Sequence, residues 1–477
     1  MSELLLAIDV GTSVTKAAAV DMQGTCVAVA RELTPVRYPA PDRAESDPDC
    51  WWPQVARCVR EVLDQEVDTD RIVAVGVSGF MHTLVPVAAG GSALHPALLW
   101  PDQRCRSEVC GLSAEGDQIK ALTGRPLTTL SSLPRLRWLR AHAPAAVDGA
   151  AHWLCVKDVV RLHLTGEVAT DRHDAEGVGL VDVRTGAWSE ELLRLAGLDA
   201  ARLPSIRAPD AIAGQVTSAA AADCGLRAGT PVVVGSGDWF STLTGSGCAL
   251  PERACAYLGS AGIIGAFASR TELDRLGATR YFGSVTSTGT ARLWIEQLLY
   301  GPGEAPGCNA SPPGARGLLF LPHLMGERGG TMRPGARGVL YGLTLAHGRE
   351  DVHRAVLEGT AMWLRTICGP RLAEVEVGDL MLFGGGARSA LWRRICAAVL
   401  ERRLLVPDCT EGALIGVAMM AAVGAGLARG YADLSRRWSR VAFVEEPAAD
   451  LVETYRAQYE RFRDLEAALA PLDAQTV

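Results

Sequence analysis

The chain has 477 residues, and its 47 Lys and Arg against 54 Asp and Glu give a formal net charge of −7. Hydrophobic residues make up 48% of the chain, which excludes a disordered protein, since disorder requires low hydrophobicity and high net charge. The acidic balance also argues against a nucleic-acid partner, because binding to phosphates needs an excess of basic side chains.

Two further features predict a cytoplasmic protein without a membrane anchor. The 13 cysteines are odd in number and form no CxxC pair, which favours buried thiols in a reducing compartment over disulfides or a zinc site. The first residues, MSELLLAIDV, lack the basic start and the long apolar region of a signal peptide. The longest uncharged run, 412–428, is short for a bilayer and rich in Gly and Ala, so we expect a buried, close-packed helix there.

Local patterns predict a β-meander at the start of the chain, where residues 4–10, 14–20 and 25–32 are apolar segments separated by short turns. A helix follows from Trp51, and residues 72–77 form an apolar strand. The second half repeats a β-turn-β element followed by alternating helices and strands. Strands are expected at 254–258, 262–267, 379–383 and 404–406, and helices at 351–368, 389–401, 412–428 and 449–469. We therefore predict two α/β domains with mixed sheets, 1–247 and 248–477.

The first candidate site is the turn after the first strand, which combines an acidic residue with small and basic ones: Asp9, Gly11, Thr12, Ser13 and Lys16. A tight turn of small residues presents backbone N–H groups and hydroxyls to a phosphate, while a carboxylate at the strand end can hold Mg²⁺ through water. An ordinary hairpin turn with a capping aspartate explains the same residues.

Two glycine-rich turns in the second half are candidates for the rest of a nucleotide site. Gly259 and Ser260 lie in a turn like the first one, and two such hairpins, one per domain, can grip one nucleotide. A predicted strand over 379–383 is followed by three glycines and then by a helix: Gly384, Gly385, Gly386 and Ser389. Bare backbone permits a flat purine to lie against the chain, with Ser389 at its edge. A flexible turn needs only one glycine, so three favour ligand approach.

A catalytic candidate follows the valine run 232–234, which predicts a buried strand. Gly235 and Gly237 let the chain bend past a ligand, and Asp238 then lies at the carboxyl end of the strand, where ligands of α/β sheets bind. An aspartate there can accept the proton of a hydroxyl that attacks a phosphoryl group, which contributes about 10²–10⁴ in rate. The alternative is an aspartate that caps the following helix. P-loop, GxGxxG, GxSxG and HExxH motifs are absent from the sequence.

These residues resemble the FGGY family of carbohydrate kinases, within the actin/hexokinase/Hsp70 superfamily. The most specific match is GVLYGL over 338–343 followed by DVHRAVLE over 351–358, which fits the family's C-terminal signature. The resemblance implies an α/β, two-domain actin/hexokinase-like (ribonuclease H-like) fold with an interdomain cleft. It also implies ATP and Mg²⁺ as cofactors, Asp238 as the catalytic base, and Asp9 as the Mg²⁺ ligand, through water.

The segments GVSGFMH over 76–82 and LWPDQR over 99–104 are similar to the xylulokinase and gluconokinase branch. This similarity implies that Met81, His82 and Asp102 line a sugar pocket. Trp239 stands where xylulokinases usually have Asn, and an indole cannot accept a hydrogen bond. We therefore expect an altered acceptor pocket, with Trp239 in contact with a less polar, deoxy, cyclic or bulkier polyol.

The predicted function is ATP-dependent phosphorylation of a hydroxyl group of a sugar, polyol or related small molecule. Two alternatives stay open: a non-catalytic sugar sensor or actin-like nucleotide switch, favoured by the altered pocket, and ATP hydrolysis without an acceptor. No nucleic acid or membrane is expected as a partner, and the sequence leaves open whether the protein forms a homodimer.

Overall fold

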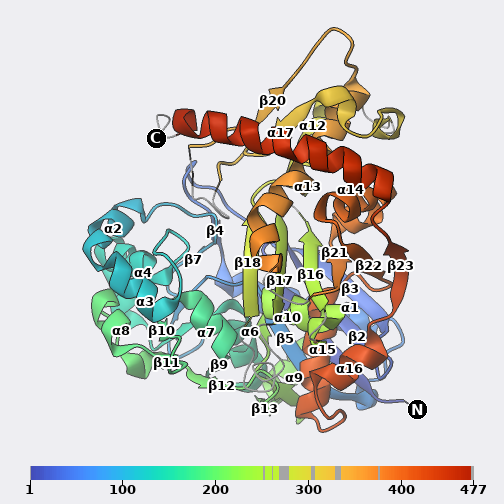
Figure 1. Cartoon of the computed structure of the whole chain (residues 1–477). Helices are drawn as coiled ribbons and strands as arrows, with labels where there is room; N and C mark the ends of the chain where they lie inside the picture. The colour runs from blue at the N-terminus through green and yellow to red at the C-terminus, as the bar shows by residue number, and fades with distance from the viewer. Residues whose placement is uncertain are drawn as a thin grey trace. The chain divides into compact units, whose positions relative to one another are not determined.

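The computed structural model describes residues 2–250, 253–259, 261–267, 279–301, 304, 307–327, 333, 335–373 and 377–473 of the chain. These residues form two compact units. The first unit comprises the chain up to Gly245 together with Glu411–Trp438, and the second comprises the other described residues. Each unit is built on its own mixed β-sheet with helices, which confirms the predicted α/β class (Figure 1).

The sheet of the first unit contains the predicted meander. Its strands are β1 (Leu4–Val10), β2 (Val14–Asp21), β3 (Cys26–Leu33), β5 (Ile72–Gly79), β13 (Ile212–Gln215), β14 (Pro231–Val233) and β15 (Ser236–Gly237). β1, β2 and β3 pair antiparallel, and β1 pairs in parallel with β5. The strand order is β13-β14-β5-β1-β2-β3, and the short strand β15 also pairs in parallel with β5. The carboxyl ends of β1, β5 and β15 therefore meet at one edge.

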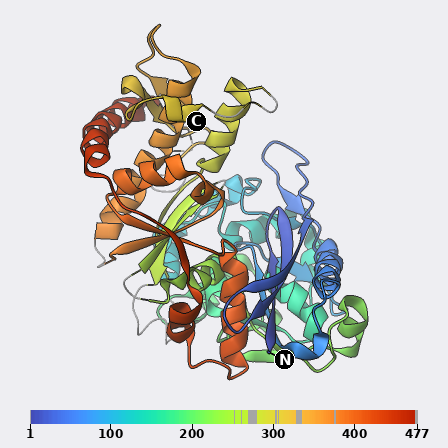
Figure 2. The same cartoon turned by 90° about the vertical axis from the view of Figure 1, so that its right-hand side faces the viewer.

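Helices cover both faces of this sheet, among them α1 (Trp51–Leu63) and α15 (Gly412–Gly424), which Figure 2 shows on opposite sides of the blue strands. α1 buries Trp51 and Trp52 in the core of the first unit, so both have a structural role. α15 is the predicted close-packed helix, because Gly416 leaves no room for a Cβ beside the Ser241 carbonyl of α10 (Asp238–Leu243). The predicted range 248–477 assigned this helix to the C-terminal domain, whereas α15 packs in the first unit.

Between β5 and β13 the chain forms a largely helical region. Its helices are α2 (Arg106–Gly111), α3 (Gly116–Thr123), α4 (Ser132–His142), α5 (Pro144–Gly149), α6 (Val156–Thr165), α7 (Arg172–Val178) and α8 (Glu190–Ala196). Short strand pairs brace them: β4 (Glu45–Ser46) with β7 (Ala97–Leu98), β6 (Val85–Val87) with β8 (His152–Leu154), β9 (Ala169–Asp171) with β12 (Ser205–Arg207), and β10 (Val181–Asp182) with β11 (Ala187–Trp188). α9 (Ser218–Cys224) and α16 (Tyr431–Trp438) complete the unit.

The sheet of the second unit has the order β18-β17-β16-β21-β22-β23. Its strands are β16 (Arg253–Leu258), β17 (Gly262–Phe267), β18 (Thr279–Val285), β21 (Asp379–Phe383), β22 (Arg403–Pro407) and β23 (Val441–Glu445). The helices are α12 (Gly289–Leu299), α13 (Arg349–Ala373), α14 (Ala390–Leu400) and α17 (Ala449–Asp473), with the strand pair β19 (Leu319–Leu321) and β20 (Val339–Tyr341). The element predicted over 449–469 is the helix α17 (Figure 1), and its residues Tyr455 and Phe462 are buried in the core.

Two expectations about the whole chain can be compared with the described residues. Most of the cysteines whose side chains are described are buried. Among the described helices, none is both long and apolar enough to cross a bilayer.

Candidate active site

Asp9 is the next-to-last residue of β1 in the middle of the first sheet, between Lys16 of β2 and Ser78 of β5. Its side chain is buried, and Oδ1 accepts no hydrogen bond within the described part of the chain. Burial raises the pKa of Asp9, the Lys16 ammonium and the Ser78 hydroxyl lower it, and the Glu411 carboxylate raises it. A buried carboxylate oxygen without a donor is suited to a cation or to an ordered water that binds one.

The turn after Asp9 is tight and open to solvent. The Gly11 N–H donates to the Val14 carbonyl at 3.1 Å, and a Cβ on Gly11 would lie 2.7 Å from that oxygen, so only glycine fits. Gly11 and Thr12 are half-buried and Ser13 is exposed, which leaves this turn accessible to a ligand.

Lys16 differs from the other predicted residues of this turn because its charge is already paired. Its Nζ lies 2.7 Å from Glu411 Oε2, and Arg31 pairs with the other Glu411 oxygen at 2.8 Å. Lys16 therefore acts on Asp9 as a neighbouring positive charge fixed by Glu411.

Asp238 is the first residue of α10 and follows directly on β15. The capping position belongs to Gly237, and no side chain caps this helix, which argues against the alternative in which Asp238 is a cap. Burial is the main cause that raises the pKa of Asp238 to about 7; the Asp9 carboxylate raises it further, and a hydrogen bond from the Trp239 N–H lowers it. The structure thus brings Asp9 and Asp238 into electrostatic contact. A carboxyl group that ionises near neutral pH is suited to accept a proton.

Met81 and His82 follow β5 and lie beside α7. A Cβ on Gly237 would meet Met81 Cγ at 2.5 Å, and one on Gly177 would meet Met81 Cε at 2.6 Å, so Met81 packs against two glycines. His82 has a positive φ of 63°, and its Nδ1 lies 2.9 Å from the Gly177 carbonyl oxygen. Because a carbonyl only accepts, Nδ1 carries the proton and Nε2 keeps a lone pair. Burial, followed by the charge of Arg125, lowers the pKa of His82 to about 4.

Trp239 is half-buried, and its Nε1 is buried without a hydrogen-bond partner among the residues that the structure describes. Because a buried N–H normally has a partner, this indole is a candidate donor to a bound molecule.

Asp102 is also a predicted pocket residue, but the structure occupies both of its oxygens. Oδ1 accepts from the backbone N–H and Nε of Arg104 at 3.1 and 2.9 Å, and Oδ2 accepts from Ala44 N and Arg104 Nη2, both at 2.8 Å. Arg104 also lies over the Trp138 ring, with its Cζ 4.9 Å from the centroid. These contacts give Asp102 a structural role in holding the loop around Arg104.

In the second unit, the turn at Gly259 and the three glycines after β21 lie against each other. A Cβ on Gly384, which has a φ of +88°, would lie 2.5 Å from the Leu258 carbonyl oxygen, and one on Gly386 would lie 2.8 Å from Leu258 Cβ. Gly385 is exposed, and a Cβ there would meet nothing within 4 Å. Packing therefore explains two of the three glycines and leaves Gly385 as the open one.

The other predicted residues near this place have mixed outcomes. Ser389 caps α14 by accepting from the Trp392 N–H at 3.3 Å, which is a structural role that still leaves its hydroxyl proton available. Thr288 donates to the Gly259 carbonyl at 3.0 Å and so fixes the turn. Ser260 lies outside the described residues.

One residue of the first unit, in contact with His82, was not predicted as functional. Arg135 is buried in α4 and donates to the carbonyls of His82 at 2.6 Å and Leu98 at 3.1 Å, and also to Thr129 and Leu99. It thus holds the backbone of His82 in its unusual conformation. The sequence gives little signal for it, because Arg135 is one of three arginines in the same helix.

A solvent-accessible turn beside the buried Asp9 and the half-buried Asp238, on an α/β sheet, is the arrangement expected of a phosphotransferase that acts on a hydroxyl group. The family model for the N-terminal domain of the FGGY family of carbohydrate kinases matches residues 4–245, and the model for its C-terminal domain matches residues 241–425. The chain belongs to the FGGY family of carbohydrate kinases.

Known proteins similar to this chain agree with that assignment. The chain is 31% identical to the xylulose kinase of Escherichia coli strain K12, over 99% of this chain and all of that protein. It is 25% identical to the gluconokinase of Bacillus subtilis, over 89% of this chain and 88% of that protein. The crystal structure of xylulose kinase from Rhodospirillum rubrum matches with a TM-score of 0.88 and 28% identity, over 99% of this chain and all of that one. The chain is therefore an enzyme, a carbohydrate kinase, and the sugar kinases of this family use ATP.

Proposed function

We propose that the enzyme transfers the γ-phosphoryl group of ATP to a hydroxyl of a sugar or polyol, with Asp238 as the base. The observation that carries the proposal is the Asp238 carboxyl, which lies at the carboxyl end of β15 with its pKa raised to about 7 by burial and by Asp9. In the reaction, the acceptor oxygen bonds to the γ-phosphorus while the bond from that phosphorus to the β,γ-bridging oxygen breaks. The hydroxyl proton passes to Asp238, and ADP leaves.

Asp9 is the residue proposed to hold Mg²⁺, through water. Its buried Oδ1 without a donor fits this role, because a hydrated cation supplies the missing partner and offsets the repulsion between Asp9 and Asp238. When bound, Mg²⁺ would neutralise charge on the phosphates. The backbone N–H groups and hydroxyls of the turn over 11–13 are proposed to contact the same phosphates.

The nucleoside end is proposed to lie at the second unit's glycines. Gly385 is the open one, so the flat face of adenine can approach the backbone there, next to the turn at Gly259. Ser389 caps α14 and can donate its hydroxyl proton to the nucleotide from there.

The acceptor pocket is proposed to use Met81, His82 and Trp239. Nε2 of His82 accepts a hydrogen bond from a substrate hydroxyl, while the Trp239 indole N–H donates to a substrate oxygen. An indole offers no acceptor and a large apolar face, which favours an acceptor with fewer hydroxyls on that side, such as a deoxy, cyclic or bulkier polyol.

The test is an ADP-release assay with Mg²⁺-ATP against a panel of sugars, polyols and cyclitols, run on the parent protein and on Asp238→Asn. We expect one class of acceptor to stimulate ADP release, and Asp238→Asn to lower kcat by about 10²–10⁴-fold while ATP still binds in calorimetry. Near-parental turnover in the variant would remove Asp238 from the mechanism. ATP binding without acceptor-dependent turnover across the panel would favour the sensor alternative, and ADP release independent of acceptor would favour hydrolysis. A homodimer and a cytoplasmic location stay predictions.

A further inference from the structure

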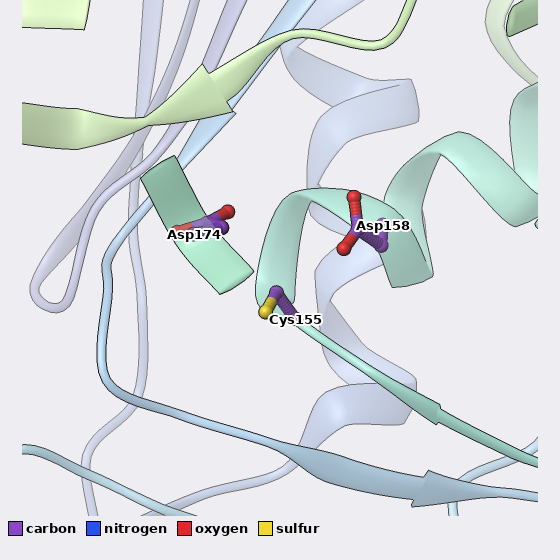
Figure 3. A group of neighbouring side chains, drawn as sticks. All are labelled: Cys155, Asp158 and Asp174. Carbon is purple, nitrogen blue, oxygen red and sulfur yellow. The ribbon is translucent and has the colours of Figure 1, made fainter. Parts of the chain in front are cut away.

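A buried cluster of charged side chains in the first unit lies beside residues 234–237, the segment that leads into Asp238. Lys157 and Arg161 of α6 contribute the positive charges, and Asp158, Asp171 and Asp174 contribute three carboxyl groups, all essentially inaccessible to solvent. Figure 3 shows part of it: Asp174 on α7 faces Asp158 and Cys155 at the start of α6. A charged group so far from water is costly unless it is paired, so this cluster demands a reason.

The cluster is not a metal centre. Ligand atoms of Cys155, Asp158 and Asp174 lie within 4.8 Å of one another, which is the spacing of a cation site. The Lys157 ammonium already fills the role of that cation, because its Nζ lies 2.7 Å from Asp158, 3.0 Å from Asp171 and 3.0 Å from Asp174. The ammonium therefore lies among three carboxyl groups, and it donates hydrogen bonds to Asp158 Oδ1 at 2.7 Å and to the Thr170 hydroxyl at 3.3 Å.

The cluster contacts the chain just before Asp238 at three successive places. Nη1 of Arg161 donates to the Val234 carbonyl at 2.8 Å, and the Ser236 hydroxyl donates to Asp171 Oδ2 at 2.7 Å. Gly237 lies against Asp174, since a Cβ there would come within 2.7 Å of Asp174 Oδ1. The other side of the same segment pairs with β5, at Ser236–Ser78 and Gly237–Gly79. The backbone leading into Asp238 is therefore held on both sides.

The same cluster reaches the acceptor pocket through α7. Asp171 caps this short helix by accepting from the His173 N–H at 3.0 Å, while its other oxygen pairs with Lys157. At the far end of α7, Gly177 accepts the hydrogen bond of His82 and packs on Met81. One set of ion pairs thus connects the base with two predicted pocket residues.

We propose that this cluster is the positioning element of the phosphoryl-transfer centre: it holds the backbone of 234–237 and the N-terminus of α7, and so fixes Asp238 relative to the acceptor hydroxyl. The proposal rests on the role proposed above for Asp238. Lys157, Asp171, Asp174 and Ser236 are positioning residues, because they act through Asp238 and do not touch the reacting atoms. A change in the distance between the Asp238 carboxyl group and the acceptor hydroxyl affects the transfer step and leaves ATP binding unchanged.

The experiment measures kcat, both KM values and thermal unfolding for Ser236→Ala and Asp174→Ala, with Lys157→Met and Lys157→Arg as a pair. A displacement of about 1 Å costs on the order of 10²-fold in rate, so we expect Ser236→Ala to lower kcat at least about tenfold with an unchanged KM for ATP. Lys157→Arg is expected to recover part of the kcat lost in Lys157→Met. Ser236→Ala removes a single hydroxyl, so its result is available even where Lys157→Met fails to fold.

Ser311→Ala is the matched control. Ser311 is a buried serine that donates to the Asp351 carboxylate at 2.6 Å in the second unit, so its loss costs a comparable hydrogen bond away from Asp238. We expect this control to lower the unfolding temperature and to leave kcat unchanged. If Asp238→Asn is inactive while Ser236→Ala and Asp174→Ala keep kcat within twofold of the parent, the positioning role is overturned and the proposed function stands. Near-parental turnover in Asp238→Asn overturns both.

Discussion

Nδ1 of His82 lies 2.9 Å from the carbonyl oxygen of Gly177, and this bond decides which ring nitrogen faces a ligand. Two substitutions separate the nitrogens. Asn places its amide N–H near Nδ1 and tolerates the positive φ of position 82, whereas Gln reaches the position of Nε2. We expect His82→Asn to raise the KM of the acceptor about tenfold, from the loss of one buried hydrogen bond, with the KM for ATP unchanged.

His82→Gln is the matched variant and should raise the KM of the acceptor less than His82→Asn does. Both values come from initial rates at saturating ATP. Equal acceptor KM values for the parent and His82→Asn would mean that Nε2 does not contact the acceptor.

The pH dependence of the reaction reports on Asp238. A base must be ionised, and the pKa of about 7 means that kcat/KM for the acceptor should fall about tenfold per pH unit below 7 and level off above it. A histidine ordinarily has a pKa in the same region, but burial lowers the pKa of His82 to about 4. His82 therefore contributes no limb to the profile between pH 5.5 and 8. The profile of His82→Gln should therefore keep the acid limb. A parent profile that is flat over this range would contradict a base with this pKa.

Helices and strands were predictable from the sequence where the pattern of apolar residues within one segment is enough to determine them. The meander, α13 and α17 follow from apolar periodicity within one segment, and each lies where the pattern indicated. β23 escaped prediction because Phe443 and Val444 are exposed on an edge strand, so its apolar residues do not mark a buried face. α7 has only seven residues, too few for a helical period to stand out.

Candidate site residues could be named where the motif itself suggests the chemistry, as at Asp9 and Asp238, and their roles stay predictions. Roles that depend on contacts between distant segments could not be named in this way. Asp102 was predicted to face the sugar, but it accepts from Ala44, 58 residues away, and the bond between Ser236 and Asp171 joins residues 65 apart. Such pairs have no spacing pattern in the chain, so only the folded structure reveals them.

The glycines at 384–386 allow a comparison of packing with ligand approach. Gly384→Ala adds a Cβ against the Leu258 carbonyl at a positive φ, a strain of about 1–3 kcal/mol, so its unfolding temperature should fall by at least about 2 °C. Gly385→Ala meets no atom and should change the unfolding temperature by no more than about 1 °C. If adenine lies on Gly385, this second variant should raise the KM for ATP several-fold. An unchanged KM for ATP would place the adenine elsewhere.

Asp174 predicts how stability changes with pH. Burial is the largest cause that raises its pKa to about 8, and the carboxylates of Asp171 and Asp158 add to this, while Lys157 lowers it. The folded chain therefore holds this proton more tightly than the unfolded chain, whose aspartates titrate near 4. Between those two values the native state binds more protons, so the free energy of unfolding must fall as the pH rises.

Asp174→Asn removes this dependence, because an amide does not titrate, while its shape matches that of the protonated acid. Thermal unfolding of both proteins at pH 5.5 and pH 8.5 measures the effect. The unfolding temperature of the variant minus that of the parent should be more positive at pH 8.5 than at pH 5.5. At pH 8.5 the parent loses stability, because its folded state either holds an ionised buried carboxyl group or keeps a proton that the unfolded chain releases. A difference between the two proteins that stays constant across this range would mean that Asp174 is already ionised at pH 5.5, with Lys157 as the dominant influence on it.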